Sequence, residues 1–194
     1  MADDEVAEAE QRFSGRELRD ALGQFCTGIT VITAVHDDAP VGFACQSFCA
    51  LSIDPPLVLF CVMKSSGSWK GIEAVGRFAV NILAEDQQDV CSTFGKRGAD
   101  KFASIDWTPS PLGSPVIDGV MAWFDCTIEK VIDGGDHWVV YGRVSDLGPT
   151  DRTDRPLLFY RGAYLRLEED VVDPTPEMEE LENFITSSGP YTWL

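Results

Sequence analysis

The sequence predicts a mainly β domain of the α+β class, in which short strands close into a barrel and a few helices flank it. Segments with strand character recur at short spacing between residues 28 and 167, while helical segments are few and scattered among them. No Gly-x-Gly-x-x-Gly motif follows a predicted strand, which disfavours a Rossmann dinucleotide site. Together these observations favour a barrel over a doubly wound parallel sheet.

The charged residues divide the 194-residue chain into a nearly neutral body with two acidic ends. The formal net charge is −17; residues 1–10 contain five acids and residues 168–182 eight, with no Lys or Arg in either segment. We therefore expect an acidic N-terminal extension over residues 1–12, one domain over residues 13–167 and an acidic tail with a short helix over residues 168–194. Acidic ends argue against nucleic acid or an anionic membrane surface as a partner.

Composition also indicates the compartment in which the protein works. No run approaches eighteen apolar residues, so we expect no membrane span, and the acidic N-terminus lacks the order of a signal peptide. The six cysteines sit mostly inside apolar segments, where a reduced Cys packs as a small hydrophobic residue. We therefore expect a cytoplasmic protein without a disulfide framework.

The body begins with a helix signal and a strand signal. Ser14 and Glu17 have the spacing of a capping box, and the apolar residues after them predict a helix over about residues 16–25 that packs on the core. Residues 28–35 are rich in β-branched side chains and predict a strand, and residues 36–40 are its turn.

The chain is organised around residues 40–71, which predict two strands separated by a sharp break. A strand over residues 41–52 contains small and polar side chains that leave room for a ligand beside the backbone. Residues 54–56 (DPP) form the break, because proline donates no backbone hydrogen bond. Residues 57–63 are apolar throughout, which predicts a strand buried on both faces. The loop at residues 64–68 (KSSGS) adds one cation and three hydroxyl groups, a set that suits a phosphate.

The remainder of the body predicts more strands around a long irregular segment. The expected elements after residue 68 are helices over residues 69–75 and 85–94 and strands over residues 77–83, 121–131, 137–147 and 156–167. Residues 95–117 are rich in Gly and Pro, and a segment of this kind is typical of a functional loop or a cover over a site. Apolar residues between 178 and 185 predict the short amphipathic helix of the tail, against a partner subunit.

Sequence motifs for metal, phosphate-loop or hydrolytic chemistry are absent. The only histidines are His36 and His137 and there is no Cys-x-x-Cys pair, so a metal site is not expected. Residues 95–98 (GKRG) lack the spacing of a Walker loop, and no Gly-x-Ser-x-Gly elbow occurs. What remains is a site built mainly from main-chain amides and hydroxyl groups, which suits a cofactor that brings its own redox chemistry.

Several blocks of the sequence resemble the short-chain flavin reductases, the small components of two-component flavin monooxygenases. The first three blocks are residues 42–48 (GFACQSF), 54–58 (DPPLV) and 64–68 (KSSGS). Further matches in the family's order are Thr93-Phe94 with Lys101-Phe102, residues 135–137 (GDH) and residues 156–164 (PLLFYRGAY). A narrower similarity, to the reductase subunits of steroid-degrading monooxygenases of actinobacteria, is carried by residues 22–33, 42–48, 159–162 and 192–194.

The resemblance implies an FMN-binding split β-barrel that forms a homodimer, with the flavin at or near the dimer interface. It implies an NAD(P)H:flavin oxidoreductase: NADH, or NADPH, reduces FMN or FAD, and the reduced flavin diffuses to a separate oxygenase component. In the narrower group that oxygenase hydroxylates a phenolic secosteroid formed during cholesterol breakdown. Two alternatives stay open, namely a reductase for another phenol-type monooxygenase and a non-catalytic flavin- or haem-binding barrel that acts as carrier or sensor. A pyridoxamine-phosphate-oxidase-like enzyme is disfavoured by residues 42–48 and 135–137.

The resemblance also implies site residues. The flavin ring and ribityl chain are expected against Pro40, Val41, Gly42, Phe43, Ala44, Gln46 and Ser47, the phosphate region against Cys61, Val62, Met63, Gly67 and Ser68, and the cover from Thr93 and Phe94. The nicotinamide nucleotide is expected to face His137, Tyr160 and Arg161, with His137 as the catalytic candidate. Without the resemblance, simpler roles serve as well: an edge-strand surface for Gln46 and Ser47, a helix cap for the serines, the core for Phe94, a surface turn for His137 and a salt bridge for Arg161.

Overall fold

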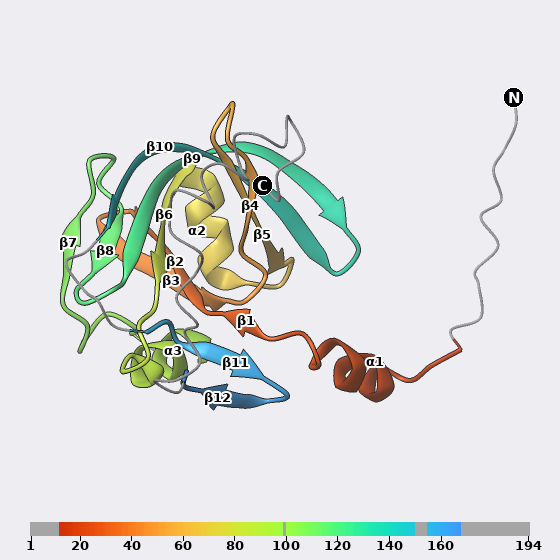
Figure 1. Cartoon of the computed structure of the whole chain (residues 1–194). Coiled ribbons are helices and arrows are strands. Elements are labelled where there is room, and N and C mark those ends of the chain that lie inside the picture. The colour runs from red at the N-terminus through yellow and green to blue at the C-terminus, as the bar shows by residue number, and fades with distance from the viewer. Residues whose placement is uncertain (1–11, 99, 150–154, 168–194) are drawn as a thin grey trace, which may run out of the picture.

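The computed structural model describes residues 12–98, 100–149 and 155–167 (Figure 1). The acidic N-terminal extension and the acidic tail with its expected helix lie outside these residues, apart from residue 12. The elements, in chain order, are α1 (Gly15–Leu22), β1 (Thr27–Gly28), β2 (Thr30–His36), β3 (Ala39–Cys45), β4 (Cys49–Ser52), β5 (Leu57–Met63), α2 (Gly67–Val75), β6 (Arg77–Ile82), α3 (Gln88–Gly95), β7 (Trp107–Pro109), β8 (Pro115–Ile117), β9 (Ala122–Gly134), β10 (His137–Pro149), β11 (Leu158–Tyr160) and β12 (Ala163–Leu165).

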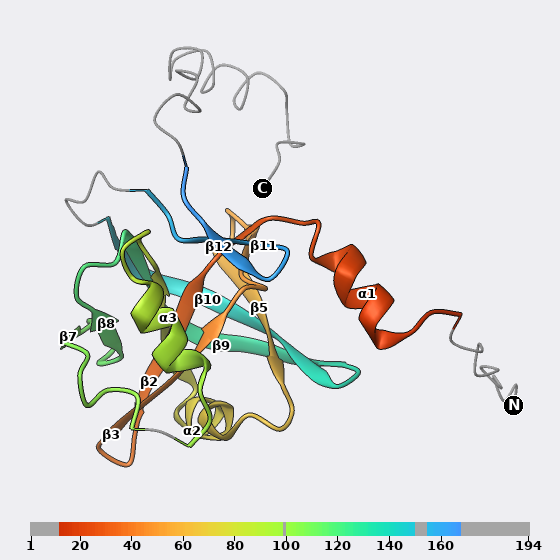
Figure 2. The same cartoon turned by 90° about the horizontal axis from the view of Figure 1, so that it is seen from below.

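One large antiparallel sheet forms the body of the molecule, with the strand order β3-β2-β6-β9-β10-β5-β4. The sheet curls round its core, and residues 46–48 connect its two edge strands, β3 and β4 (Figures 1 and 2). Between β3 on one side and β5 with β4 on the other, the curled sheet is open; we call this opening the split. The predicted mainly β barrel with a few flanking helices is thereby confirmed.

The interior of the barrel is filled by aromatic side chains and by α2. Phe60 lies at the centre, with its ring centroid 5.2 Å from that of Phe78 and 6.0 Å from that of Trp69, both in edge-to-face geometry. These three side chains are at most 1% exposed. A Cβ atom on Gly142 would lie 2.5 Å from the ring of Phe78, so glycine is required where β10 passes this cluster. Burial of each large apolar side chain stabilises the fold by roughly 1.5–3 kcal/mol.

A second apolar cluster lies on the outer face of β2. Ile32 of this strand points into the barrel, whereas its neighbour Val31 packs with Leu83, Phe94 and Ile117 outside it. Successive side chains of a strand point to opposite faces, so β2 is buried on both sides. This outer layer holds α3 against β2 and β3, and α3 carries Phe94 towards the split.

The central strands differ from expectation in two respects. The strand expected over residues 41–52 is two strands, β3 and β4, because residues 46–48 cross the split from one edge of the sheet to the other. The expectation that β5 is buried on both faces was wrong. Phe60 is fully buried but Cys61 only half-buried, because alternate side chains of β5 face the barrel core and the opening.

Helix α1 begins as predicted but packs differently. Ser14 Oγ accepts a hydrogen bond from the Glu17 backbone N–H at 3.2 Å, and Glu17 Oε2 accepts one from the Ser14 N–H at 2.7 Å. The helix stands away from the barrel in both views (Figures 1 and 2), and Leu22 and Phe25 are 64% and 77% exposed. The prediction that this apolar stripe packs on the core was therefore wrong, because a stripe specifies a face to be covered but not what covers it.

Two further segments contain more structure than the sequence indicates. The irregular segment after α3 includes the hairpin β7–β8, whose Ile117 packs in the outer cluster. The last strand is divided into β11 and β12, which form a small sheet with β1. None of the helices in the described ranges has the length and apolar character that crossing a membrane requires.

Candidate functional site

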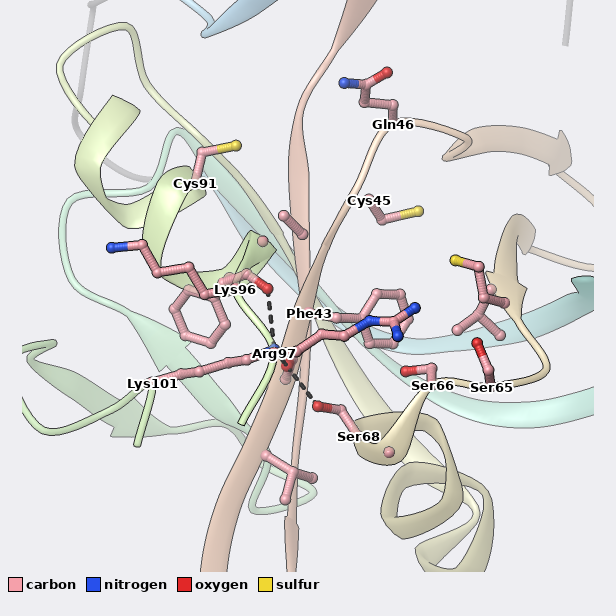
Figure 3. A pocket seen from close by; sticks show the side chains of 18 of the residues that line it. Phe43, Cys45, Gln46, Ser65, Ser66, Ser68, Cys91, Lys96, Arg97 and Lys101 are labelled. Atoms are coloured by element: carbon pink, nitrogen blue, oxygen red, sulfur yellow. Dashed lines mark hydrogen bonds between the residues drawn. The ribbon is translucent and has the colours of Figure 1, made fainter. Parts of the chain in front are cut away.

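A cavity of about 790 Å³ opens at the split, between β3 and β5 (Figure 3). It is lined by residues 29, 40–47, 61–63, 65–68, 91, 94–98, 100–102 and 137. The residues that the sequence assigns to flavin and nucleotide therefore lie together, except for Thr93, Tyr160 and Arg161. Segments far apart in the chain meet here because both walls belong to one curled sheet.

The wall formed by β3 is fixed by a close contact with α3. A Cβ atom on Gly42 would lie 2.9 Å from the Ile32 carbonyl oxygen and 2.9 Å from Phe94 Cε1. Real Cβ atoms do not approach other atoms this closely, so glycine at this position allows Phe94 to pack directly on the strand. Phe94 is 1% exposed, so it lies in the core, and it also lines the cavity.

The Gly42 carbonyl oxygen accepts hydrogen bonds from two side chains that line the cavity. Ser68 Oγ donates to it at 2.8 Å and Lys101 Nζ at 3.0 Å, and Lys101 Nζ also donates to the Phe94 carbonyl oxygen at 3.0 Å. Burial lowers the pKa of the Lys101 ammonium. A hydroxyl group has a single proton, so Ser68 acts here as a tie between α2 and β3.

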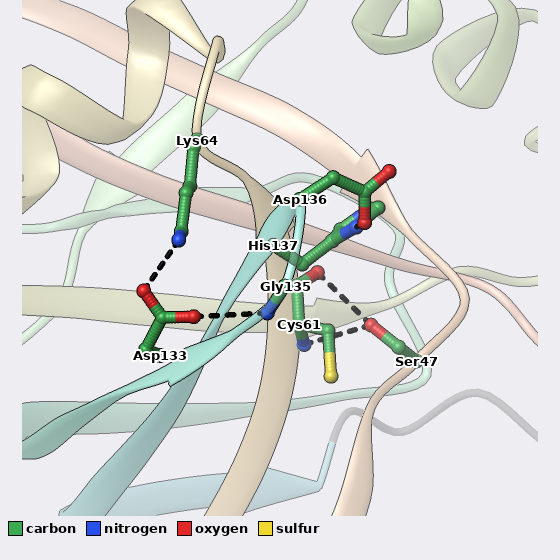
Figure 4. A network of polar contacts seen from close by, with 7 residues as sticks. All are labelled: Ser47, Cys61, Lys64, Asp133, Gly135, Asp136 and His137. Atoms are coloured by element: carbon green, nitrogen blue, oxygen red, sulfur yellow. Dashed lines mark hydrogen bonds and ion pairs between the residues drawn. The ribbon is translucent and has the colours of Figure 1, made fainter. Parts of the chain in front are cut away.

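The split is bridged by the side chain of Ser47. Its hydroxyl donates to the Cys61 carbonyl oxygen at 3.0 Å and accepts from the Cys61 backbone N–H at 2.8 Å (Figure 4). The side chain thus replaces the pair of ladder hydrogen bonds that a strand would make at this point of β5. Because its proton is used in this bridge, the atoms nearby that remain to donate to a ligand are main-chain amides and the side-chain amide of exposed Gln46.

His137 lies at the rim of the cavity, at the start of β10. Its Nδ1 atom is 2.6 Å from Asp136 Oδ1, and its backbone pairs with that of Met63 (Figure 4). The hydrogen bond from His137 holds the pKa of the Asp136 carboxyl below its usual range. A carboxylate only accepts hydrogen bonds, so Nδ1 donates to it and Nε2 is left as the ring nitrogen available to a ligand.

Lys64 lies outside the cavity, contrary to the expectation that its charge serves a phosphate there. Its Nζ atom is 2.5 Å from Asp133 Oδ2 and 4.5 Å from the ring centroid of Trp138 (Figure 4). Lys64 therefore ties the loop before α2 to the β9–β10 hairpin. The cations that line the cavity are instead Lys96, Arg97 and Lys101, in the segment after α3. The sequence signal for them was the basic pair in residues 95–98, which does not form a Walker loop.

Three predicted site residues do not line the cavity. Thr93 is on α3, one residue before Phe94. Tyr160 and Arg161 lie at the turn of the small sheet, where the Tyr160 hydroxyl donates to Gln24 Oε1 at 3.2 Å and the Arg161 backbone N–H to the Gly23 carbonyl oxygen at 3.0 Å. Arg161 adopts a φ of 50°, in the left-handed region that few residues other than glycine occupy.

Cys45 and Cys91 also line the cavity, and sequence reasoning gave these two thiols no part in the site. Cys45 Sγ is 3.2 Å from Ser47 Oγ, and Cys91 Sγ accepts a hydrogen bond from the Tyr164 hydroxyl at 3.3 Å. Burial raises the pKa of both thiols, which keeps them protonated and unreactive. In the part of the chain with described coordinates, no group of three His, Cys, Asp or Glu side chains could hold a metal ion.

Comparison with known proteins places this geometry among flavin reductases. A family model described as the flavin reductase like domain matches residues 22–168. The chain is 57% identical over 188 residues to the flavin-dependent monooxygenase reductase subunit HsaB of Rhodococcus jostii, covering 97% of this chain and 96% of that protein.

Two solved structures share the fold and much of the length. The nitrilotriacetate monooxygenase component B homologue of Mycobacterium thermoresistibile is 60% identical, with a TM-score of 0.81 and coverage of 88% of this chain and 96% of that one. The NADH:FAD oxidoreductase SgcE6 of Streptomyces globisporus, solved with NAD and FAD fragments, is 33% identical, with a TM-score of 0.76 and coverage of 80% and 94%.

Proposed function

The chain belongs to the flavin reductase family and is the reductase component of a two-component monooxygenase, and from this premise we propose that NADH reduces FMN or FAD in the cavity at the split. One observation carries the proposal: the family's sequence blocks that contain Gly42, Ser68, Lys101 and His137 converge on a single cavity. Its volume of about 790 Å³ is in the range typical of cofactor sites.

The residues present fit a flavin. Ala44 has a small side chain, so a flat ring could lie close to the main chain of β3, and the amides of residues 46 and 47, which line the cavity, are the proposed donors to its polar edge. Ser65 and Ser66, at the entry to α2, supply hydroxyl groups for the phosphate region. A bound flavin supplies the redox chemistry, while the protein contributes orientation and polarity.

Positioning supplies the catalysis in this proposal. His137, held by Asp136, is oriented at the rim, where it would contact the nicotinamide nucleotide. A bound flavin would accept hydride directly from the nicotinamide, so the protein would need to hold the two molecules in position and would not itself have to transfer a proton. The name of the Streptomyces relative supports NADH as donor and FAD as one acceptor; FMN is the second candidate acceptor, and NADPH a second candidate donor.

The oxygenase that receives the reduced flavin is proposed to hydroxylate a phenolic secosteroid. Support comes from the 57% identity to the HsaB subunit over nearly the whole of both chains. The Mycobacterium homologue carries the name of a nitrilotriacetate enzyme, so the two substrates should be compared directly. The reductase is mixed in turn with an oxygenase that acts on the secosteroid and with one that acts on nitrilotriacetate, and the hydroxylated product is measured in each mixture. Product from the secosteroid is the expected result.

We propose a homodimer in which α1 packs on the partner subunit. The exposed stripe of Leu18, Leu22 and Phe25 has no cover within the described part of the chain. An apolar hollow of about 650 Å³, lined by residues 25–30, 46–49 and 82, adjoins the cavity and offers a complementary surface. The nicotinamide role proposed for Tyr160 and Arg161 then depends on this assembly, since the two residues do not line the cavity of their own chain.

All six cysteines are unpaired, which supports a cytoplasmic location.

The function is tested by stopped-flow oxidation of NADH in the presence of free flavin. The expected result is oxidation of many equivalents of NADH per protein chain, with release of flavin on dialysis. A carrier or sensor would instead oxidise one equivalent and stop. Retention of flavin in both redox states through extensive washing would contradict a diffusing product.

A further inference from the structure

The cavity has a basic edge that comes from one short segment. Of the residues that line it, Lys96, Arg97 and Lys101 are cationic and Asp100 is the one carboxylate. Asp100 Oδ1 accepts a hydrogen bond from the Phe102 backbone N–H at 3.2 Å. In a chain with a formal net charge of −17, this local excess of positive charge gives the cavity the opposite sign to the protein as a whole.

Lys101 is a half-buried cation that has no anionic partner in the described part of the chain. Two of its N–H groups donate to the carbonyl oxygens of Gly42 and Phe94, both at 3.0 Å, and an ammonium has three. No carboxylate among the described residues lies within ion-pair distance of it. Removing a cation from water without a counter-charge is unfavourable, and burial accordingly lowers its pKa. The third N–H and the uncompensated charge are thus available to an anion in the cavity.

Arg97 extends into the same space from the same segment as Lys101. Its guanidinium reaches across the cavity past Phe43, towards Ser65 and Ser66 (Figure 3). Ser66 Oγ accepts from the Trp69 backbone N–H at 3.3 Å, so its own proton is free to be donated. A guanidinium and a hydroxyl facing each other across a gap are a good match for phosphate oxygens.

Resting on the proposed function, we infer that Lys101 and Arg97 bind the flavin phosphate and make the enzyme selective for phosphorylated flavins over riboflavin. Ser66 completes the set of donors. Lys64, the cation of the loop at residues 64–68, is excluded from this role because it is paired with Asp133 and stacked on Trp138. The inference assigns the phosphate to the segment after α3, whereas the sequence assigned it to residues 61–63, 67 and 68.

A purely structural role for Lys101 makes a different prediction. If Lys101 only ties β3 to α3, its loss distorts the cavity for every flavin, with or without phosphate. If it binds phosphate, its loss weakens FMN and spares riboflavin, which has the same ring and ribityl chain. The ratio of the two affinities therefore separates the roles, even in a variant that is partly destabilised.

The experiment measures dissociation constants of FMN and riboflavin for the full-length protein by fluorescence titration. The variants are Arg97→Gln, Lys101→Met and Lys101→Arg, with Lys70→Gln as a control. Lys70 is an exposed cation of α2 that does not line the cavity, so its loss changes the net charge equally. We expect wild type and Lys70→Gln to bind FMN about tenfold or more tightly than riboflavin. Arg97→Gln and Lys101→Met should each bind FMN about tenfold more weakly than wild type does, while their affinity for riboflavin should change by less than about threefold.

Two further results are expected, and several would overturn the inference. Lys101→Arg should keep most of the preference, and inorganic phosphate should weaken FMN binding to wild type but not riboflavin binding. Equal affinity of wild type for both flavins, an unchanged ratio in both variants, or a parallel loss of both affinities in Lys101→Met would overturn it. If wild type binds neither flavin, the proposed function itself fails, which is a separate outcome.

Discussion

Gly42 and Phe94 are in contact at the point where the outer helix meets the wall of the cavity. A methyl group on residue 42 would stand 2.9 Å from the ring of Phe94 and equally close to the carbonyl oxygen of Ile32. Phe94 is buried and the backbone of Ile32 is paired with the neighbouring strand β6, so neither can move aside freely. The position of α3 relative to β3 therefore depends on the missing side chain at residue 42.

Gly42→Ala is expected to lower both stability and flavin affinity. Insertion of a methyl group into a packed site costs about 1–3 kcal/mol, because strand or ring must shift. Urea unfolding and flavin titration measure the two effects. Gly28→Ala is the matched control, since a Cβ atom there meets nothing within 4 Å, and it should change stability by less than about 0.5 kcal/mol. A Gly42→Ala protein with the wild-type urea midpoint would contradict the packing argument.

Ser47→Ala is expected to loosen the split. The change leaves the N–H and C=O of Cys61 without their side-chain partner, which should cost about 0.5–1.5 kcal/mol because both groups are near solvent. Ser47→Thr keeps the hydroxyl and should retain most of the stability. The comparison is made by urea unfolding, with flavin affinity measured alongside. Equal midpoints for the alanine variant and wild type would show that the bridge contributes nothing.

His137→Ala is expected to slow NADH-dependent turnover more than it weakens binding of oxidised flavin. The imidazole is proposed to position the nicotinamide, so kcat/KM for NADH should fall by about tenfold while the Kd for oxidised flavin changes by less than about threefold. Asp136→Asn should shift kcat/KM in the same direction by less, because the His137 ring loses its carboxylate acceptor. The reverse pattern would remove His137 from the nucleotide side.

Asp125→Asn is expected to stabilise the protein at neutral and alkaline pH. Asp125 is fully buried on β9, with Oδ2 2.6 Å from the Leu112 backbone nitrogen, and burial raises the pKa of its carboxyl despite that hydrogen bond. A pKa raised on folding means that the protonated form is favoured; its stabilising contribution is present at acidic pH and lost as pH rises through the folded-state value. Asparagine is neutral at every pH, so the variant should exceed wild type by about 1 kcal/mol at pH 8.

Urea midpoints of wild type and Asp125→Asn at pH 5 and pH 8 provide the check. The urea midpoint of Asp125→Asn should exceed that of wild type by less at pH 5 than at pH 8. Nearby Asp146 also raises the pKa of Asp125 and Arg77 lowers it, so Asp146→Asn is a useful second variant with a smaller effect. If the urea midpoint of wild type rose relative to that of Asp125→Asn as the pH increased, the effect would be opposite to the one expected and would refute the argument.

Leu22→Asp is expected to dissociate the proposed homodimer. The side chain is 64% exposed on α1, and a carboxylate in a covered apolar stripe would have to be desolvated. Light scattering coupled to gel filtration should change from twice the mass of one chain to the mass of a single chain. Arg19→Asp, which places the same acid elsewhere on the helix, should leave the mass doubled. A wild-type protein that elutes as a monomer at all concentrations would disprove the assembly.

The local parts of the site could be predicted from the sequence. Residues 54–56 mark a break, the apolar run after them marks β5, and the serine loop marks the start of α2, because each signal acts on its immediate neighbours. Gly42 and Ser47 were placed at the site by the resemblance to flavin reductases and not by a local signal of this kind. The atoms that these residues offer were harder to foresee, since the Ser47 hydroxyl is used by Cys61 and the Ser68 hydroxyl by Gly42.

The charged parts of the site could not be predicted, because they depend on contacts between distant segments. Lys101 lies 59 residues from its partner Gly42, and Lys64 lies 69 residues from Asp133. Spacing along the chain does not determine which loop folds onto which strand. The same holds for α1, whose apolar stripe was recognised but whose cover is not part of the barrel.

The cavity has both of its walls on a single sheet, with four strands, β2, β6, β9 and β10, between β3 and β5 in the strand order. The aperture therefore depends on the summed twist of those four strands, and a small rotation at each accumulates across the set. We therefore expect packing against these strands, such as that of Phe78 on β6 against Gly142 on β10, to affect how wide the opening is. Substitutions remote from any ligand can in this way change the affinity of the cavity for a flat molecule and the rate at which that molecule dissociates.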